Sequence, residues 1–314
     1  MVDNKYDIVG IGNSIVDVIT DVEDQFLNDH ELRKGLMSLV DLDGIKNISG
    51  KIDIKKTVSG GSVANSIVGL SQLGNDVGFI GKVNDDDLGG KYEDGLKTEN
   101  VKYFYSKKKE ELPTGTCLIL VTPDSERTMC TFLGTAGKIN ENDVDTNAIK
   151  KSEIIFLEGY LWDEGDPRKA FDKAINNANK VAMSLSDKFC VDRHKTNFLE
   201  LVKNKLDIIF ANEQEIMSLI DAKSFADVIE FGKSLNKILV ITRGEKGSLS
   251  INNGNLYECD SKKNIEVKDL TGAGDLFAAG YLHGFINKSE EKACLEKGNE
   301  LASKIIQKIG ARLI

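Results

Sequence analysis

Hydrophobic runs in the second half of the chain alternate with helical stretches. Four runs, at 153–157, 180–185, 207–211 and 237–242, are mostly apolar and five or six residues long. Runs of this length are typical of strands buried on both faces, and strands that alternate with helices favour right-handed β-α-β units. The pattern therefore predicts a parallel sheet that is covered by helices on both of its faces.

The first half of the chain adds a strand, a helix and a hairpin to this pattern. Residues 6–12 form a buried-strand pattern, and Gly60-Gly61 precedes a stretch in which apolar residues recur at helical spacing. Two β-prone segments within 114–132 flank Pro123-Asp124-Ser125, which predicts a hairpin, and 247–259 has a similar form. We therefore expect a single α/β core with a small β-rich insertion near the N-terminal half.

The amino-acid composition argues against several classes of protein. The chain has 314 residues, 40% of them hydrophobic and 29% charged, which is typical of a soluble globular protein. A net charge of -9 argues against a nucleic-acid partner, and no apolar run approaches the ~18 residues needed to span a bilayer. The five cysteines are scattered and the N-terminus lacks a signal-peptide pattern, so we expect a cytoplasmic protein without membrane association.

Three small residues stand where a strand is expected to turn into a helix. The segment Asp269–Asp275 follows a β-prone run at 264–268 and precedes an apolar helical run. Backbone amides at such a turn, here those of Gly272, Ala273 and Gly274, bind anions. Asp275 would lie in the first helical turn, where a carboxylate can take a proton from a nucleophile that attacks phosphorus. The alternative is an ordinary Gly-rich turn in which Asp275 only caps the helix.

Polar clusters also follow two other predicted strands. Asn212–Glu215 comes after the strand that ends at Ala211, and Thr242–Gly247 begins at the end of the next strand. Ligands of open α/β sheets bind beyond the carboxyl ends of the strands, so the clusters predict a site for a phosphorylated ligand with a divalent ion. The chain lacks G-x-x-x-x-G-K-[ST] and the H-R-D and D-F-G elements, which argues against a Walker-type NTPase or a protein kinase.

A second group of small and polar residues lies near the N-terminus. Asn13 and Asp17 would share one face of a strand, because side chains repeat every two residues. The pair either belongs to an exposed strand face or binds sugar hydroxyls. Gly60 and Gly61 would allow a ligand to approach the start of the following helix, and Asn65 would point toward the same place.

These motifs together resemble the ribokinase-like, or PfkB-type, carbohydrate kinases. Asp269–Asp275 is similar to the C-terminal signature of that family, and Gly60–Asn65 is similar to its N-terminal signature. Asn212–Glu215 resembles the N-x-x-E motif, and Thr242–Gly247 resembles the nucleotide loop. The order and spacing match over nearly the whole chain, although Leu270 stands where many members have a small or hydroxylated residue.

The resemblance implies a three-layer α/β/α core with a mostly parallel sheet and a small β-sheet lid. We expect the core to comprise 1–12, 53–100 and 136–314, and the lid 13–52 and 101–135. Within the family the chain is most similar to adenosine kinase, through Gly10–Asp17, Thr114–Cys117 and the lid arginine Arg127. By that likeness, the ribose of the substrate would be bound by a set of residues near the N-terminus: Asn13, Asp17, Gly60, Gly61, Ser62 and Asn65.

The resemblance and the residue patterns predict one reaction. MgATP would lie against a second set of residues, namely Asn212, Thr242, Gly244, Gly247 and Asn299. Glu215 would hold Mg²⁺, through water rather than directly. Asp275 would accept the proton of a primary hydroxyl, the 5′-hydroxyl if the substrate is adenosine. Gly272, Ala273 and Gly274 would stabilise the transferring phosphoryl group, with Arg127 adding a cation from the lid.

Two alternatives stay open at this point. Sugar kinases of the same family, acting on fructose, ribose or 2-keto-3-deoxygluconate, share the early aspartate and the Gly-Gly-Asn cluster. A non-catalytic regulator that binds nucleotides or nucleosides is the other alternative, and retention of Asp275 with its glycine turn argues against it. The sequence also leaves open a potassium ion behind the anion hole, as in many relatives, and whether the chain is a monomer or pairs through its lid.

Overall fold

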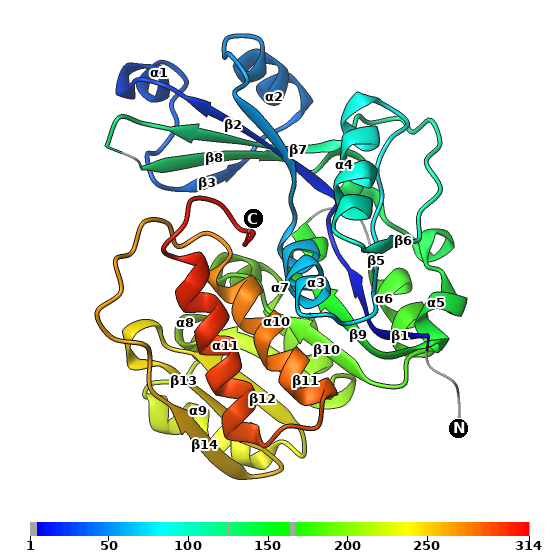
Figure 1. Cartoon of the computed structure of the whole chain (residues 1–314), viewed down its shortest axis with the longest axis vertical. Helices are drawn as coiled ribbons and strands as arrows, with labels where there is room; N and C mark the ends of the chain where they lie inside the picture. Colours follow the sequence, from blue (N-terminus) through cyan, green and yellow to red (C-terminus); the bar gives the residue numbers. More distant parts are fainter. Residues whose placement is uncertain (1–4, 125, 164–166, 314) are drawn as a thin grey trace.

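The fold is built on a large, mostly parallel sheet. The computed structural model describes residues 5–124, 126–163 and 167–313, and within them nine strands pair in the order β14-β13-β12-β11-β10-β9-β1-β5-β6 (Figure 1). All neighbouring pairs from β12 to β6 are parallel, and β13 and β14 form an antiparallel edge. The strands are β1 (Tyr6–Ile11), β5 (Val77–Ile80), β6 (Lys102–Tyr103), β9 (Ser152–Glu158), β10 (Val181–Ser184), β11 (Ile208–Asn212), β12 (Ile238–Thr242), β13 (Ser248–Asn252) and β14 (Asn255–Cys259).

Helices cover both faces of this sheet, so the core has three layers. Successive strand residues such as Ile8 and Val9 enter different hydrophobic clusters, as the two-residue period of a strand requires. One cluster contains residues of α3 (Ser62–Gln72), α4 (Asp87–Thr98), α10 (Ala273–Ile286) and α11 (Glu291–Ile305). The other contains residues of α5 (Thr146–Lys150), α6 (Arg168–Ile175), α7 (Lys188–Asn204), α8 (Glu213–Leu219) and α9 (Phe225–Ser234). The predicted three-layer α/β/α arrangement is confirmed.

A second, five-stranded sheet lies beyond the carboxyl ends of the core strands (Figure 1). We call it the lid. Its order is β3-β8-β7-β2-β4, and β7 pairs antiparallel with β8, as the predicted hairpin requires, although Ser125 of the turn lies outside the described residues. Its elements are β2 (Ile15–Asp21), β3 (Met37–Leu39), β4 (Lys56–Ser59), β7 (Gly115–Val121) and β8 (Arg127–Phe132), with α1 (Asp24–Asp29) and α2 (Leu42–Ser49) packed on one face.

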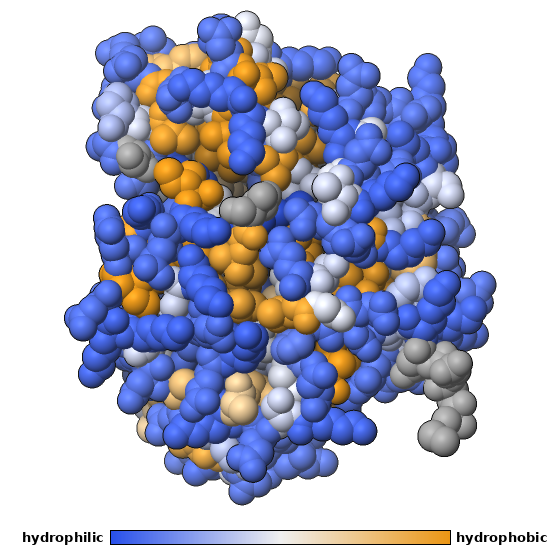
Figure 2. Space-filling model, in the orientation of Figure 1, coloured by the Kyte–Doolittle hydropathy of each residue, from blue (hydrophilic) through white to orange (hydrophobic). Residues whose placement is uncertain are grey.

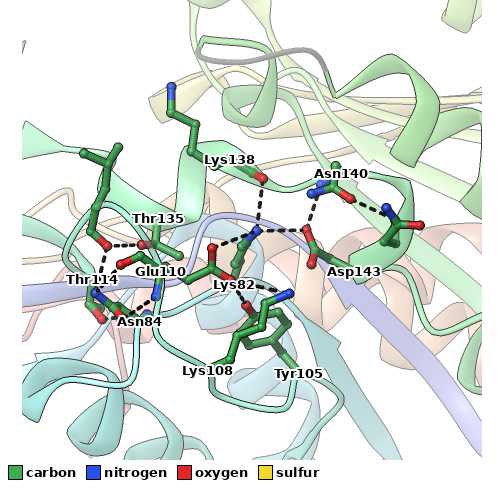
Figure 3. Close-up of polar contacts among 12 residues, drawn as sticks. Lys82, Asn84, Tyr105, Lys108, Glu110, Thr114, Thr135, Lys138, Asn140 and Asp143 are labelled. Carbon is green, nitrogen blue, oxygen red and sulfur yellow. Dashed lines mark hydrogen bonds and ion pairs between the residues drawn. The ribbon is translucent and has the colours of Figure 1, made fainter.

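The loop that leads into the lid strand β7 is tied to the core by a buried lysine. Lys82 lies 3.3 Å from a carboxylate oxygen of Asp143 and 3.4 Å from one of Glu110, and only 5% of the lysine is exposed (Figure 3). Glu110 also accepts a hydrogen bond of 2.6 Å from the Tyr105 hydroxyl group. A buried cation between two carboxylates fixes where the lid begins relative to the core.

Three details differ from the expectations. The run 264–268 is not a strand: Val267 is exposed, and the backbone amides of Lys268 and Asp269 bond to the carbonyl oxygen of Ile306 at the end of α11 instead of a neighbouring strand. Strand propensity alone does not decide the conformation of this run, because its backbone amides bond to the end of α11 instead. In addition, β4 belongs to the lid sheet and β6 to the large sheet, so each lies across one of the expected boundaries.

Short 3₁₀ helices complete the chain at Gly134–Lys138, Glu141–Asp143, Gly159–Asp163 and Gly244–Lys246. Among the helices in the described ranges, none has both the length and the apolar character required to cross a membrane.

Candidate active site

A cavity of about 660 Å³ lies between the lid and the core and collects residues from both. Its core side is formed by the ends of β9, β10, β11 and β12 and by the start of α10, and its lid side by β2, β3, β7 and β8. Figure 2 shows hydrophobic side chains gathered over the lid and again below it, at the boundary with the core. The cavity lies at the sheet edge where α/β proteins bind ligands.

The turn before α10 has the conformation that an anion site needs. Gly272 is the N-cap of α10 with φ 78, which a residue with a side chain rarely adopts. The amide of Ala273 donates to the carbonyl oxygen of Leu270 (3.2 Å) and closes the turn. Of the three amides expected to bind an anion, that of Ala273 is therefore already engaged, whereas those of Gly272 and Gly274 lie beside it at the positive end of the helix dipole.

Asp275 lies in the first turn of α10 and is held by two residues of α3. One carboxylate oxygen accepts a hydrogen bond from the Ser62 hydroxyl (2.6 Å), and the other accepts one from the Asn65 side-chain amide (3.0 Å). Burial raises the pKa of the Asp275 carboxyl to about 6, while both hydrogen bonds and the charge of Arg312 lower it. A carboxylate with a pKa near the working pH is suited to accept a proton.

Asp17 and Asn13 contribute from the lid side of the cavity. Burial raises the pKa of Asp17 to about 7, against the charges of Arg312 and Arg127, and Asp275 raises it further. Asn13 donates to Glu158 from its backbone and side-chain amides (3.1 and 3.0 Å). The side-chain carbonyl oxygen of Asn13 is buried and lacks a hydrogen-bond partner among the described residues. That oxygen and Asp17 are two acceptors available to the hydroxyl groups of a ligand.

Glu158 is a member of this group that the sequence analysis missed. It ends β9, lines the cavity, and accepts a hydrogen bond of 2.9 Å from the Val63 amide in the first turn of α3. Burial raises the pKa of the Glu158 carboxyl to about 7. An acidic residue at the carboxyl end of an apolar strand was the available signal, since the same position drew attention to Asn212.

The residues expected to hold MgATP fall into two groups. Asn212, Glu215, Thr242 and Gly244 line the same cavity as Asp17. Gly247 and Asn299 line no part of this cavity: Asn299 donates to the carbonyl oxygen of Asp260 (3.1 Å), and Gly247 has φ 86 where the chain turns into β13. These two residues shape the loops around the site.

The fit of a magnesium ion rests on two carboxylates. The Glu215 carboxylate accepts from the backbone amide of Asn212 (2.9 Å), and the Asn212 side-chain oxygen accepts from the backbone amide of Glu215 (2.8 Å), which forms a capping box at the start of α8. The carboxylate also accepts from the side-chain amide of Asn212 (2.5 Å). Burial raises the pKa of Glu215 to about 7, and Asp187, which lines the same cavity, raises it further. The described residues contain no preformed cluster of three metal-ligating side chains. The two carboxylates fit an ion that keeps most of its water shell and is shared with phosphate oxygens.

The lid presents an apolar wall beside these polar groups. Met37 and Leu39 of β3 are 36% and 45% exposed and line the cavity. Tyr160 lines it from the core side and is partly exposed. The remaining apolar residues of the wall come from β2, β7 and β8 and from the position directly after β8: Ile15, Cys117, Ile119, Met129 and Leu133.

Arg127 lies beside the cavity rather than in its lining. Its guanidinium group forms an ion pair of 2.9 Å with Asp269, and both side chains are at least nine-tenths buried. Arg127 instead lines a second cavity of about 470 Å³, which shares Asp17 and Asn65 with the first. Gly60 packs directly against Asp17, because a Cβ atom on Gly60 would stand 2.4 Å from a carboxylate oxygen of Asp17. Both residues are therefore adjacent to the acceptor side of the site.

Known proteins of similar sequence and structure are kinases. The chain is 28% identical to 5-dehydro-2-deoxygluconokinase of Clostridium botulinum (strain Alaska E43 / Type E3), over 97% of this chain and 88% of that protein. Adenosine kinase from Sinorhizobium meliloti superposes with a TM-score of 0.90 at 34% identity, over 99% and 97% of the two chains. A probable sugar kinase from Rhizobium etli CFN 42 superposes with a TM-score of 0.89 at 32% identity, over 98% and 95%.

The family follows from these matches and from the profile that covers most of the chain. The profile described as pfkB family carbohydrate kinase matches residues 41–314. The segments that gave the resemblance in the sequence, Gly60–Asn65, Asn212–Glu215 and Asp269–Asp275, all contribute residues to the one cavity. The chain belongs to the pfkB family of carbohydrate kinases, and it is a kinase that acts on a sugar or nucleoside hydroxyl group.

Proposed function

We propose that this kinase transfers the γ-phosphoryl group of ATP to the 5′-hydroxyl of adenosine, which gives AMP. The observation that carries the proposal is the composition of the cavity. Its lid side combines hydroxyl-binding acceptors, Asn13 and Asp17, with an apolar wall that includes Met37 and Leu39. A free sugar presents hydroxyl groups on all sides, whereas a nucleoside presents a polar ribose and a flat base.

In the proposed complex the ribose lies between Asp17 and Asp275, and the base lies between the lid wall and Tyr160. Asp275 accepts the proton of the 5′-hydroxyl group while the oxygen of that hydroxyl group attacks the γ-phosphorus. The amides of Gly272 and Gly274 stabilise negative charge on the transferring group, and Arg127 is close enough to the acceptor side to add positive charge after a change of its ion pair with Asp269.

ATP is proposed to lie against Asn212, Thr242 and Gly244, with its phosphates toward the α10 turn. Magnesium held by Glu215 and Asp187 through water would neutralise charge on the phosphate oxygens. Closure of the lid over both ligands would exclude water, which otherwise competes with the hydroxyl group as phosphoryl acceptor. A cytoplasmic location and a monovalent cation behind the anion turn remain predictions.

The second candidate is a kinase for an acidic sugar. It is favoured by the similarity to 5-dehydro-2-deoxygluconokinase and by the cations around the second cavity, among them Lys56, Arg127, Lys268 and Arg312. These charges lie next to Asp17, where they would suit the carboxylate of a sugar acid.

A substrate panel separates the two candidates. Purified protein is assayed for ADP formation from MgATP with adenosine, inosine, cytidine, ribose, fructose and 2-keto-3-deoxygluconate. We expect kcat/KM for adenosine to exceed that for each free sugar by at least about tenfold. A preference for 2-keto-3-deoxygluconate would favour the second candidate, and a failure to turn over adenosine above the ATP-only rate would contradict the first.

A further inference from the structure

The segment after α11 forms a third side of the site. It runs between the core helices and the lid (Figure 1) and lines both cavities through Ala311. The amide of Gly310 donates to the carboxylate of Asp269 (2.7 Å). The segment also packs against the anion turn, since a Cβ atom on Gly272 would stand 2.7 Å from the Cα atom of Ala311. The position of this segment is thus fixed by contacts with the same turn that carries Asp275.

Arg312 extends from this segment to the catalytic carboxylate through one intermediate residue. The arginine is 7% exposed, and its Nε donates to the side-chain carbonyl oxygen of Asn65 (3.1 Å). Its Nη1 donates to the Ser59 hydroxyl group (2.8 Å). Because the Asn65 oxygen faces a cation, the Asn65 amino group must face the other way, where it donates to Asp275 (3.0 Å).

We propose that Arg312 is a positioning residue for phosphoryl transfer: it orients the Asn65 amide toward Asp275 and places a positive charge near that carboxylate. The inference rests on the proposed role of Asp275 as the base. It adds a residue outside the motifs that define the site.

The environment of Arg312 supports an electrostatic role rather than a purely packing role. Its two hydrogen-bond partners are neutral, and its Nη2 is buried without a hydrogen-bond partner among the described residues. Burying a guanidinium group beside neutral partners is unfavourable unless nearby carboxylates compensate. The carboxylates whose charge interacts with it include Asp17 and Asp275.

The same charge acts on the titration of Asp275. Removal of Arg312 takes away one of the influences that lower the pKa of Asp275, so the pKa should rise. The other groups that interact with Asp275 are the donors Ser62 and Asn65 and the acidic side chains of Asp17, Glu158 and Tyr160. Because only the ionised form of Asp275 accepts a proton, the acid limb of the pH–rate profile should move to higher pH.

The test compares Arg312→Gln and Arg312→Lys with Lys304→Gln, which removes an exposed charge from α11. For the preferred acceptor of the substrate panel, we expect Arg312→Gln to lower kcat roughly tenfold. KM should change less than about threefold if that acceptor is adenosine, whereas the KM of a sugar acid held by the cations of the second cavity should rise. The acid limb of Arg312→Gln should move up by about half a pH unit or more. Arg312→Lys should restore the acid limb but only part of kcat, because an ammonium group lacks the planar fork. Lys304→Gln should leave both quantities unchanged.

Two further measurements connect the effect to Asn65 and to folding. In an Asn65→Ala background, Arg312→Gln should lower kcat less than about twofold further, since residues that act through one another are not additive. If Arg312→Gln does not fold, Arg312→Lys decides the question through its kcat. If Arg312→Gln folds, wild-type kcat together with an unmoved acid limb would overturn the inference. If Arg312→Gln does not fold, wild-type kcat in Arg312→Lys would overturn it. Normal turnover by Asp275→Asn would instead contradict the proposed base.

Discussion

Replacing Asp275 with Asn removes the proposed base with little change in shape. The wild-type carboxylate accepts from the Ser62 hydroxyl and from the Asn65 amide. An Asn side chain can keep its oxygen toward Asn65 and turn its amino group toward Ser62, whose hydroxyl is able to accept. Both contacts of the side chain therefore remain available, so the fold and the binding of the acceptor should be kept.

The expected effect on catalysis is large. A positioned general base contributes about 10²- to 10⁴-fold, so we expect kcat of Asp275→Asn to fall by at least ~10²-fold, or roughly 2.7 kcal/mol of transition-state stabilisation. KM for the acceptor should change little, because Asn13 and Asp17 still hold it. An exposed first-turn residue on another helix, Asp87, supplies the matched control, and Asp87→Asn should keep wild-type kcat.

The same substitution should stabilise the protein in a pH-dependent way. The pKa of Asp275 is raised from 3.8 to about 6, so the folded state binds the proton more readily than the unfolded state does. The ionised carboxylate therefore destabilises the folded state by at most about 3 kcal/mol. This penalty is absent below pH ~4, grows as the pH rises to ~6 and is constant above. The advantage of Asp275→Asn should follow that course.

Two assays check this prediction. Initial rates of ADP formation give kcat and KM, and urea unfolding between pH 4 and pH 8 gives the difference in the free energy of unfolding. Normal turnover by Asp275→Asn would refute the assignment of the base. A stability difference that is the same at pH 4 and pH 7 would refute the argument from burial, even if turnover were lost.

Three other substitutions test separate parts of the structure. Lys82→Met should lower the free energy of unfolding by about 3–5 kcal/mol in urea titrations, because the carboxylates of Asp143 and Glu110 lose the buried cation between them. Leu39→Asp should raise KM for adenosine at least about tenfold in steady-state assays and leave the melting temperature nearly unchanged, since the side chain is 45% exposed on the apolar wall. Gly272→Ala should reduce kcat at least about tenfold and lower the melting temperature, because φ 78 and contact with the C-terminal segment leave no room for a methyl group.

The sequence was sufficient for the frame of the molecule because its signals are local. An apolar run such as 208–211 can be buried on both faces only within a covered sheet, and the glycines at 60–61 and 272 precede helices where the pattern indicates. The expected strand at 264–268 was wrong because β propensity does not reveal whether a partner strand is available. A local signal thus predicts a helix or strand correctly only where the tertiary structure can accommodate that element.

The parts of the site that the sequence did not indicate depend on contacts between distant segments. Met37 and Leu39 look like core residues until β3 is placed at the cavity, and Tyr160 follows a strand end with no motif around it. Arg312 is separated from Asn65 by 247 residues, and no periodicity or spacing connects them. Such residues become recognisable only when the topology brings them beside the motifs.

The carboxylates around the cavity show how the free protein is prepared for its ligands. Burial raises the pKa of Asp17, Glu158 and Glu215 to about 7 and that of Asp275 to about 6. Burial therefore disfavours the ionised form of each group in the free protein, and two of the groups would gain a partner in the proposed complex. Substrate hydroxyls would donate to Asp17, and hydrated magnesium would neutralise Glu215. Because both effects favour the ionised forms, binding near pH 7 should release protons, and the favourable interaction gained on binding offsets the cost of burying these charges in the folded protein.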